Sequence, residues 1–375
     1  MKIKIFLSSL FILALSTSAM AKIHNGIQVT TKTTQSLLGN DQNIYVNVSY
    51  KNNSGQAVKI LRWYLPDSEG NLEEAIFKVT RDGENVDYLG PHYKRPAPTG
   101  EDYITLKNNQ KLNFKVELSG LYDFTQQGQY QIDLSVKNHA LFLSETPAVT
   151  SKRGQLLGVK PNFSALSSDQ AAYVYVTKTR SYKGKPCNPR KEDCSGDGGG
   201  DGGGSNGDVS FTGACSNSEQ NSIMTALAAA QDMANSSVSY LNGNSGPRYT
   251  TWFGEHSNSR WSKVASNFDS IKDALDNKSK TFDCSCNQRY FAYVYPSQPY
   301  KVYLCKAFWS ASTTGTDSKG GTIIHEMSHF NVVAGTDDIV YGQSGAMSLA
   351  DSSPSDAIKN ADSHEYFAEN KPNLN

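Results

Sequence analysis

The chain has 375 residues, and its 36 Lys and Arg balance 36 Asp and Glu, so it carries no net formal charge. This length suggests two domains, and the lack of a basic surplus argues against a nucleic-acid partner. Hydrophobic residues make up 38% of the chain, and its one long apolar run lies at the N-terminus, so no membrane-spanning bundle is expected.

The first 21 residues have the pattern of a secretory signal peptide. Lys2 and Lys4 precede an apolar stretch at 5–15, and Ala19-Met20-Ala21 matches the small-x-small sequence of a cleavage site. The apolar stretch is too short to span a bilayer comfortably. We therefore expect cleavage after Ala21 and secretion to the extracellular space. An oxidising environment favours disulfides for the six cysteines.

Residues 22–180 are expected to form an all-β, sandwich-like propeptide domain. Apolar residues alternate with polar ones at 44–50, 112–118 and 130–136. This alternation is typical of strands with one buried face, and no helical pattern lies between them.

Nothing in this β-rich part has the spacing of a catalytic motif. His24, His92 and His139 are scattered and lack spaced partners. Each is interpreted as a surface histidine rather than a ligand.

Residues 181–208 are expected to be a linker that contains the processing region. Ser195–Asp208 consists mostly of glycine, which favours a flexible segment. A calcium loop is the alternative interpretation, but no acidic ligand follows at EF-hand spacing. Nearby basic residues make the segment a protease target, and Lys183, Lys185 and Lys191 are candidate scissile lysines.

Residues 209–375 have an α+β pattern. Ser216 and Glu219 form a capping box that predicts the start of a helix. Residues 291–295 and 302–305 are expected to form a hairpin. Pro354 is placed at the first position of a last helix that begins at Ser353.

The segment Thr322–Phe330 contains an HExxH pattern. His325 and His329 are four residues apart, so on a helix they project from one face and can chelate one ion. Glu326 lies beside them and is placed to take a proton from the attacking water. Two imidazoles and a carboxylate with an open fourth position suit zinc.

The third ligand is expected to be Asp338. The metzincin pattern would need a glycine and a histidine at the positions of Val332 and Gly335, so that class is excluded. Gly335 allows a sharp reversal after the helix, which can return the Asp338 carboxylate to the metal.

The pattern HExxH followed by GTxDxxYG, which ends at Tyr341-Gly342, resembles the aspzincins, the deuterolysin-like zinc endopeptidases. The resemblance extends over Phe211–Asn375 and is strongest to the peptidyl-Lys metalloendopeptidase branch. Both halves together resemble secreted bacterial aspzincins, some of which act as toxins. The resemblance implies a zincin-like catalytic domain at 209–375.

The resemblance also implies the residues of the active site. One Zn²⁺ per chain would be bound by His325, His329 and Asp338. Glu326 would be the general base, and Tyr341 would donate a hydrogen bond to the oxyanion of the tetrahedral intermediate.

The last predicted helix carries the expected specificity residues. Asp362 and Glu365 are three apart and share a helical face. The resemblance implies that they line the S1′ pocket, so that cleavage falls on the amino side of lysine. Two solvated surface acids are the alternative from the residues alone. A zinc-ligand role for Glu365 or Glu369 is weaker, because the Asp338 motif is complete.

The resemblance implies the disulfides Cys215–Cys284 and Cys286–Cys305, which leaves Cys187–Cys194 as the third pair. A zinc site made by these cysteines is disfavoured, because the Cys284-Ser285-Cys286 sequence has no second pair at ligand spacing.

The sequence therefore predicts a secreted, monomeric zymogen that acts on proteins or peptides, with its own propeptide as inhibitor, chaperone or both. Two other functions remain open: a non-catalytic adhesin with a structural zinc, and a zinc hydrolase of a non-peptide substrate. Glu326 discriminates against the adhesin, since a structural zinc site has no use for a general base.

Overall fold

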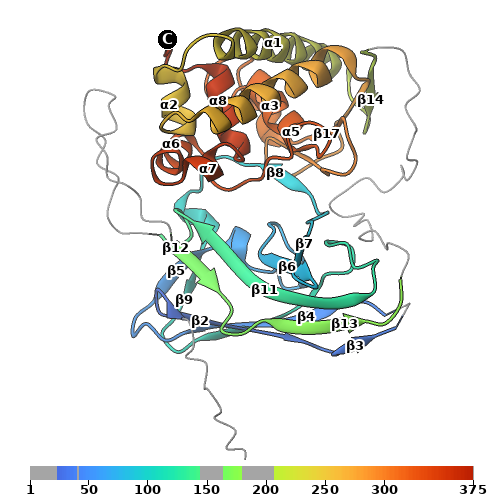
Figure 1. The fold of residues 1–375 in the computed structure, drawn as a ribbon, viewed down its shortest axis with the longest axis vertical. Helices are drawn as coiled ribbons and strands as arrows, with labels where there is room; N and C mark the ends of the chain where they lie inside the picture. The colour runs from blue at the N-terminus through green and yellow to red at the C-terminus, as the bar shows by residue number, and fades with distance from the viewer. Residues whose placement is uncertain (1–22, 40–41, 144–163, 180–206, 375) are drawn as a thin grey trace, which may run out of the picture.

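The computed structural model describes residues 23–39, 42–143, 164–179 and 207–374. Within these residues, a β-rich N-terminal region precedes a C-terminal region of helices around a smaller sheet (Figure 1). The predicted signal peptide, the Cys187–Cys194 pair and nearly all of the predicted linker lie outside the described residues.

The N-terminal region consists of short strands and two single-turn 3-10 helices. They are β1 (Ile23–His24), β2 (Ile27–Thr33), β3 (Leu37–Leu38), β4 (Tyr45–Asn52), β5 (Val58–Leu61), η1 (Arg62–Tyr64), β6 (Phe77–Arg81), β7 (Glu84–Val86), β8 (His92–Lys94), η2 (Gly100–Asp102), β9 (Tyr103–Leu106), β10 (Lys111–Glu117), β11 (Gly128–Asn138), β12 (Ser164–Ser167) and β13 (Ala172–Val176).

Two larger sheets share one apolar core in this region. The first has the order β1-β2-β4-β10, and the second has the order β3-β13-β11-β6-β7 with β12 also paired to β11. β5 and β9 form a separate ribbon. Alternate residues of β4 and β11, such as Val46, Val48, Ile132 and Leu134, are buried in the shared core. This arrangement agrees with the β-rich, sandwich-like region that the alternating sequence predicts.

The C-terminal region has eight helices and four strands among the described residues. They are β14 (Val209–Thr212), α1 (Asn217–Leu241), α2 (Pro247–Phe253), α3 (Asn258–Asn277), β15 (Lys280–Asp283), β16 (Ala292–Val294), β17 (Lys301–Leu304), α4 (Lys306–Ser310), α5 (Lys319–His329), α6 (Gln343–Ser352), α7 (Pro354–Ala357) and α8 (Ala361–Glu369).

Two local predictions for this region are confirmed. Ser216 is the N-cap of α1, and Glu219 completes the capping box. The predicted hairpin is the antiparallel pair β16–β17, in which Ala292 lies opposite Leu304.

The prediction of one last helix from Ser353 is wrong. Pro354 does begin a helix, but α7 ends at Ala357, and α8 begins after the N-cap Asn360. The buried Asn360 side chain accepts hydrogen bonds from the backbone N–H groups of Ile339 and Val340, at 3.0 Å each. These bonds hold the segment that follows Asp338 against the start of α8.

The C-terminal sheet contains one strand from the N-terminal region. Its order is β14-β15-β17-β16-β8, and β8 pairs antiparallel with β16. In Figure 1, β8 lies with the helical region, apart from the other N-terminal strands. β8 therefore extends the C-terminal sheet at its edge, as an added peptide strand does in β-augmentation.

The helices α5 and α8 pack closely in the core of the C-terminal region. Gly321 on α5 makes this approach possible, because a Cβ there would lie 2.1 Å from the Glu369 carboxylate on α8. Disulfides join Cys215 to Cys284 and Cys286 to Cys305. Among the described residues, no helix is long and apolar enough to cross a membrane.

Candidate active site

The HExxH residues lie on α5 and are fully buried. Ser318 caps this helix, and its hydroxyl accepts a hydrogen bond from the Gly321 N–H at 3.0 Å. His325, Glu326 and His329 each have no solvent exposure. The i, i+4 spacing places both imidazoles on one face of the helix, with ring centroids 4.8 Å apart.

Asp338 returns to this face after the reversal at Gly335, whose φ is +58°. Its Oδ1 lies 3.1 Å from His325 Nε2 and 3.4 Å from His329 Nε2. Ligand atoms of one tetrahedral zinc, at bond lengths near 2.0–2.1 Å, lie about 3.3 Å apart. The three side chains therefore have the spacing and the N/O chemistry that a zinc ion needs.

The other nitrogen of each imidazole faces an oxygen atom away from Asp338. His329 Nδ1 lies 2.8 Å from the Thr336 carbonyl oxygen, and His325 Nδ1 lies 3.0 Å from Asp362 Oδ1. Oxygen atoms in these positions favour the tautomer that directs Nε2 toward a metal. Glu365 Oε2 is 3.2 Å from the same His325 Nδ1, so it lies beside the expected metal ligand rather than among the three.

Glu326 has the properties of a proton-transfer group. Neither of its buried carboxylate oxygens has a hydrogen-bond partner among the described residues. Burial raises the pKa of the Glu326 carboxyl to about 7. A carboxyl group with a pKa near neutrality can both accept and return a proton.

The two predicted specificity residues meet a lysine from the N-terminal region. Lys94 Nζ on β8 lies 3.1 Å from Asp362 Oδ1 and 2.9 Å from Glu365 Oε2. Asp317 adds a third carboxylate at 2.9 Å, and the ring of Tyr366 lies 5.2 Å from the amine. Burial alone would lower the pKa of Lys94, but these carboxylates raise it well above its ordinary value. The amine is thus charged, buried and paired.

Tyr341 also contacts the N-terminal region. Its hydroxyl donates a hydrogen bond to Glu74 Oε1 at 2.9 Å, and the same oxygen accepts from Arg95 Nε at 2.9 Å. The Tyr341 ring packs edge-on against Trp63, with centroids 5.5 Å apart. The predicted oxyanion donor is therefore engaged by side chains of the N-terminal region.

β8 contacts the expected metal ligands directly. The Tyr93 backbone N–H donates to Asp338 Oδ2 at 3.0 Å. Alternate residues of a strand face opposite sides, so His92 and Lys94 point toward α5 while Tyr93 packs against Tyr290 and Tyr293. The interpretation of His92 as a surface histidine is wrong, because its ring lies 4.7 Å from that of His329.

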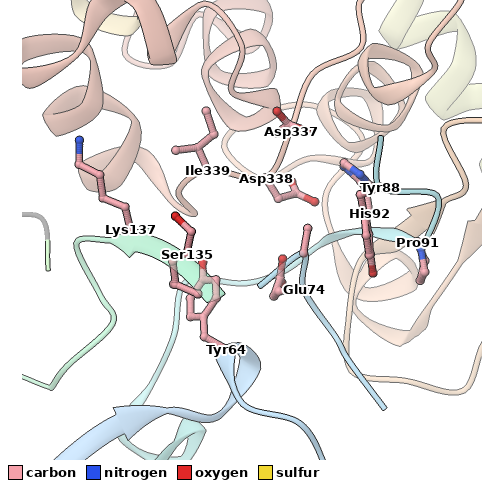
Figure 2. A pocket seen from close by; sticks show the side chains of 12 residues that line it. Tyr64, Glu74, Tyr88, Pro91, His92, Ser135, Lys137, Asp337, Asp338 and Ile339 are labelled. Carbon is pink, nitrogen blue, oxygen red and sulfur yellow. The ribbon is translucent and has the colours of Figure 1, made fainter. Parts of the chain in front are cut away.

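A cavity of about 280 Å³ adjoins this contact. Figure 2 shows Glu74, His92 and Tyr64 of the N-terminal region on its wall, together with Asp337 and Asp338 of the C-terminal region. The β-rich region thus covers the site without filling all the space beside it.

Four residues that contact this site are not among those predicted from the sequence: Glu74, His92, Lys94 and Asp317. The first three lie in the β-rich region, where no local spacing distinguishes them from other surface residues. Once an acidic pocket is predicted, each lysine of the N-terminal region is a candidate occupant, and that is the only signal the sequence offers for Lys94.

Comparisons with known proteins agree with this geometry. The aspzincin family model, described as "Lysine-specific metallo-endopeptidase", matches residues 239–369, which include α5, Asp338 and α8. The chain is also 45% identical over 343 residues to an extracellular protease of Aeromonas hydrophila, across 90% of this chain and 91% of that protein. The chain belongs to the aspzincin family.

Two further aspzincin relatives come from one fungus. A peptidyl-Lys metalloendopeptidase of Grifola frondosa is 34% identical over 343 residues, covering 88% of this chain and 89% of that protein. The solved structure of a zinc peptidase from Grifola frondosa matches 43% of this chain and 100% of its own, with 49% identity and a TM-score of 0.42.

Family membership confirms the predicted class of enzyme. This aspzincin is a metalloendopeptidase with a β-rich region before an α+β region. The non-catalytic adhesin and the hydrolase of a non-peptide substrate are therefore set aside.

Proposed function

We propose that this aspzincin is the secreted zymogen of a zinc endopeptidase that cleaves on the amino side of lysine. The observation that carries the proposal is Lys94, whose buried amine lies among Asp317, Asp362 and Glu365 beside His325. The prosegment would hold the enzyme inactive by presenting this lysine as a substrate would.

His325, His329 and Asp338 would hold one zinc ion. When bound there, zinc supplies a Lewis acid that polarises the scissile carbonyl and increases the acidity of water. The ligand spacing supports this assignment, as do the partners that orient each imidazole.

Glu326 would act as general base and then as general acid. Its carboxylate would take a proton from the attacking water and deliver it to the leaving amine of lysine. Once Glu74 has left, the Tyr341 hydroxyl would donate to the oxyanion that develops on the scissile carbonyl.

The acidic pocket would select the residue after the cleaved bond. A buried amine without partners is strongly disfavoured, whereas one paired with two or three carboxylates is stabilised. Asp362 is itself fixed by the Gly342 N–H, which donates to its Oδ2 at 2.6 Å. A substrate lysine would make the contacts that Lys94 makes here.

The prosegment would inhibit at three points. β8 pairs with β16 at the edge where a substrate strand would bind, Lys94 fills the acidic pocket, and Glu74 accepts a hydrogen bond from Tyr341.

We place the signal peptide at 1–21, the prosegment at 22–180, the processing linker at 181–208 and the protease at 209–375. Cleavage in the linker would let the prosegment leave. Assistance with folding would be a second, separate role of the prosegment.

Relatives support the proposed location and substrates. One is named an extracellular protease and another a peptidyl-Lys metalloendopeptidase. Together with the sequence of residues 1–21, these names support export of this chain and cleavage of extracellular proteins or peptides. A monomeric state and a toxic role stay predictions.

The test uses processed enzyme and a denatured, lysine-rich protein, with mass spectrometry of the new N-termini. The expected products begin with lysine, and Glu326→Ala enzyme yields none. Asp362→Asn and Glu365→Gln should reduce cleavage before lysine, whereas Asp351→Asn, at an exposed position on α6, serves as the matched control. Products with mixed N-termini would remove the specificity assignment, and no products from zinc-loaded enzyme would remove the peptidase assignment.

A further inference from the structure

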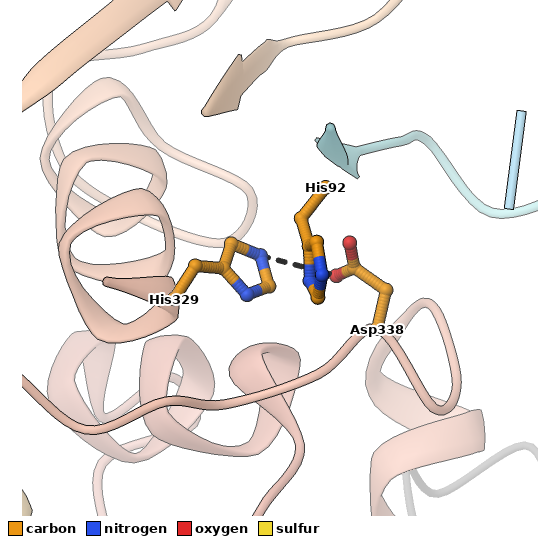
Figure 3. A group of neighbouring side chains, drawn as sticks. All are labelled: His92, His329 and Asp338. Atoms are coloured by element: carbon orange, nitrogen blue, oxygen red, sulfur yellow. Dashed lines mark ion pairs between the residues drawn. The ribbon is translucent and has the colours of Figure 1, made fainter. Parts of the chain in front are cut away.

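His92 is placed against the expected metal ligands by the same strand that delivers Lys94. Because the two residues are separated by one position, both side chains face α5. One ligand atom from each of His92, His329 and Asp338 lies within 4.8 Å of the others (Figure 3). The His92 and His329 rings meet at an angle of 63°.

The His92 imidazole lacks the partner that its surroundings require. Its Nδ1 is buried and has no hydrogen-bond partner among the described residues. The neighbouring Tyr88 ring lies 5.8 Å away. A buried imidazole nitrogen without a partner is costly, and a metal ion shared with His329 would satisfy it.

We propose that His92 is a ligand of the zinc ion in the uncleaved chain, beside His325, His329 and Asp338. This inference rests on the proposed zymogen, because it requires β8 in the cleft. Four protein ligands make a closed site, whereas a catalytic zinc site keeps one position open for water or substrate. The prosegment would thus remove the position that the reaction needs, and not only cover the cleft.

The distances allow this coordination with a small adjustment. Ligands of one tetrahedral zinc lie about 3.3 Å apart, so a separation of up to 4.8 Å closes with a shift on the order of 1.5 Å. Rotation about the two side-chain torsions of His92 can supply such a shift. On release of the prosegment, His92 would leave with β8, and the site would then be open to water or substrate.

The test is a count of imidazole ligands in the intact chain. The full-length Glu326→Gln protein, which cannot process itself, is loaded with zinc and examined by X-ray absorption at the zinc edge. We expect three imidazoles, falling to two in the His92→Phe variant. Tyr93→Phe is the matched control on the same strand, since its ring faces away from α5, and it should keep three.

Zinc affinity gives a second readout. Loss of a direct ligand should raise the zinc dissociation constant of the intact chain at least about tenfold. Removal of a residue that only hydrogen-bonds to a metal ligand already weakens metal binding by about this factor. His92→Asn repeats the measurement with a short polar side chain. Unchanged affinity in both variants would overturn the inference.

A zinc-directed hydroxamate separates the failure of this inference from the failure of the proposed zymogen. If the intact chain excludes the hydroxamate and has three imidazoles, both proposals hold. If the intact chain excludes the hydroxamate but has two imidazole ligands, His92 is not a ligand and only the zymogen proposal holds. If the intact chain binds the hydroxamate as readily as the processed enzyme does, β8 is not in the cleft and both proposals fall.

Discussion

Replacement of Lys94 by methionine should release β8 from the cleft of the intact chain. The Lys94 side chain has no solvent exposure, and its amine lies within 3.1 Å of three carboxylates. Methionine has a similar length and no charge, so it leaves the buried Asp362 and Glu365 without their cation.

The size of this effect follows from the burial of the pair. Removal of one partner from a buried ion pair costs about 3–5 kcal/mol, because the remaining charge is left desolvated and unpaired. Each 1.4 kcal/mol is a factor of ten, so the ratio of open to closed cleft should rise roughly 140- to 3,700-fold. Charge repulsion between the two carboxylates acts in the same direction.

The assay is the initial rate at which freshly purified, unprocessed chain cleaves a fluorogenic peptide with a single lysine. The wild-type chain should be nearly inactive. The Lys94→Met chain should cleave the peptide at an initial rate at least two orders of magnitude higher, up to the rate of processed enzyme. Lys51→Met, at an exposed position on β4, is the matched control and should stay as inactive as wild type. Gel electrophoresis checks that the chain is uncleaved during the measurement.

A Lys94→Met chain that folds normally and stays as inactive as wild type would show that the Lys94 ion pairs do not hold β8 in the cleft. The three carboxylates would then contribute nothing to holding the strand. Circular dichroism and the thermal midpoint of unfolding establish normal folding.

Three further predictions concern catalysis, pH and the support of Asp338. Glu326→Gln in processed enzyme should lower kcat by about 10²–10⁴-fold while zinc content, measured by atomic absorption, is unchanged; loss of zinc instead would contradict its role in proton transfer. Burial lowers the pKa of His139 to about 4, and its ring lies against Gly345 of the C-terminal region. Between pH 6.5 and 4 the unfolded chain binds a proton at His139 that the folded chain does not bind. The free energy of unfolding of wild type should therefore fall by up to about 3 kcal/mol over this range, and urea unfolding should show a decrease smaller by this amount in His139→Phe. Asn360→Ala leaves the half-buried Ile339 N–H and the buried Val340 N–H without acceptors, and it should destabilise the full chain by about 2–4 kcal/mol and weaken zinc binding; an unchanged thermal midpoint would remove this role.

The local elements were predictable because their signals lie within a few residues. The capping box at Ser216 specifies the start of α1, and the i, i+4 histidines specify a helix with one metal-binding face. The turn at Gly335 and the carboxylate of Asp338 follow in the same short stretch. Side chains on one continuous motif need no knowledge of distant pairing.

The contact of β8 with β16 was not predictable in this way. β8 has three residues, and its partner lies about two hundred residues further along the chain. Alternation within a strand says which side chains share a face but not which distant edge the strand joins. The break at Asn360 has the same origin, because the groups that its side chain binds belong to the Asp338 segment.

We expect one lysine-binding cleft to serve both the substrate and the prosegment. The most direct measurement compares intact and linker-cleaved chains from one preparation, at equal zinc content, on the same lysine peptide. We expect the intact chain to be nearly inactive and the cleaved chain, freed of its prosegment, to cut on the amino side of lysine. An intact chain that cleaves this peptide as fast as the freed enzyme would contradict this expectation.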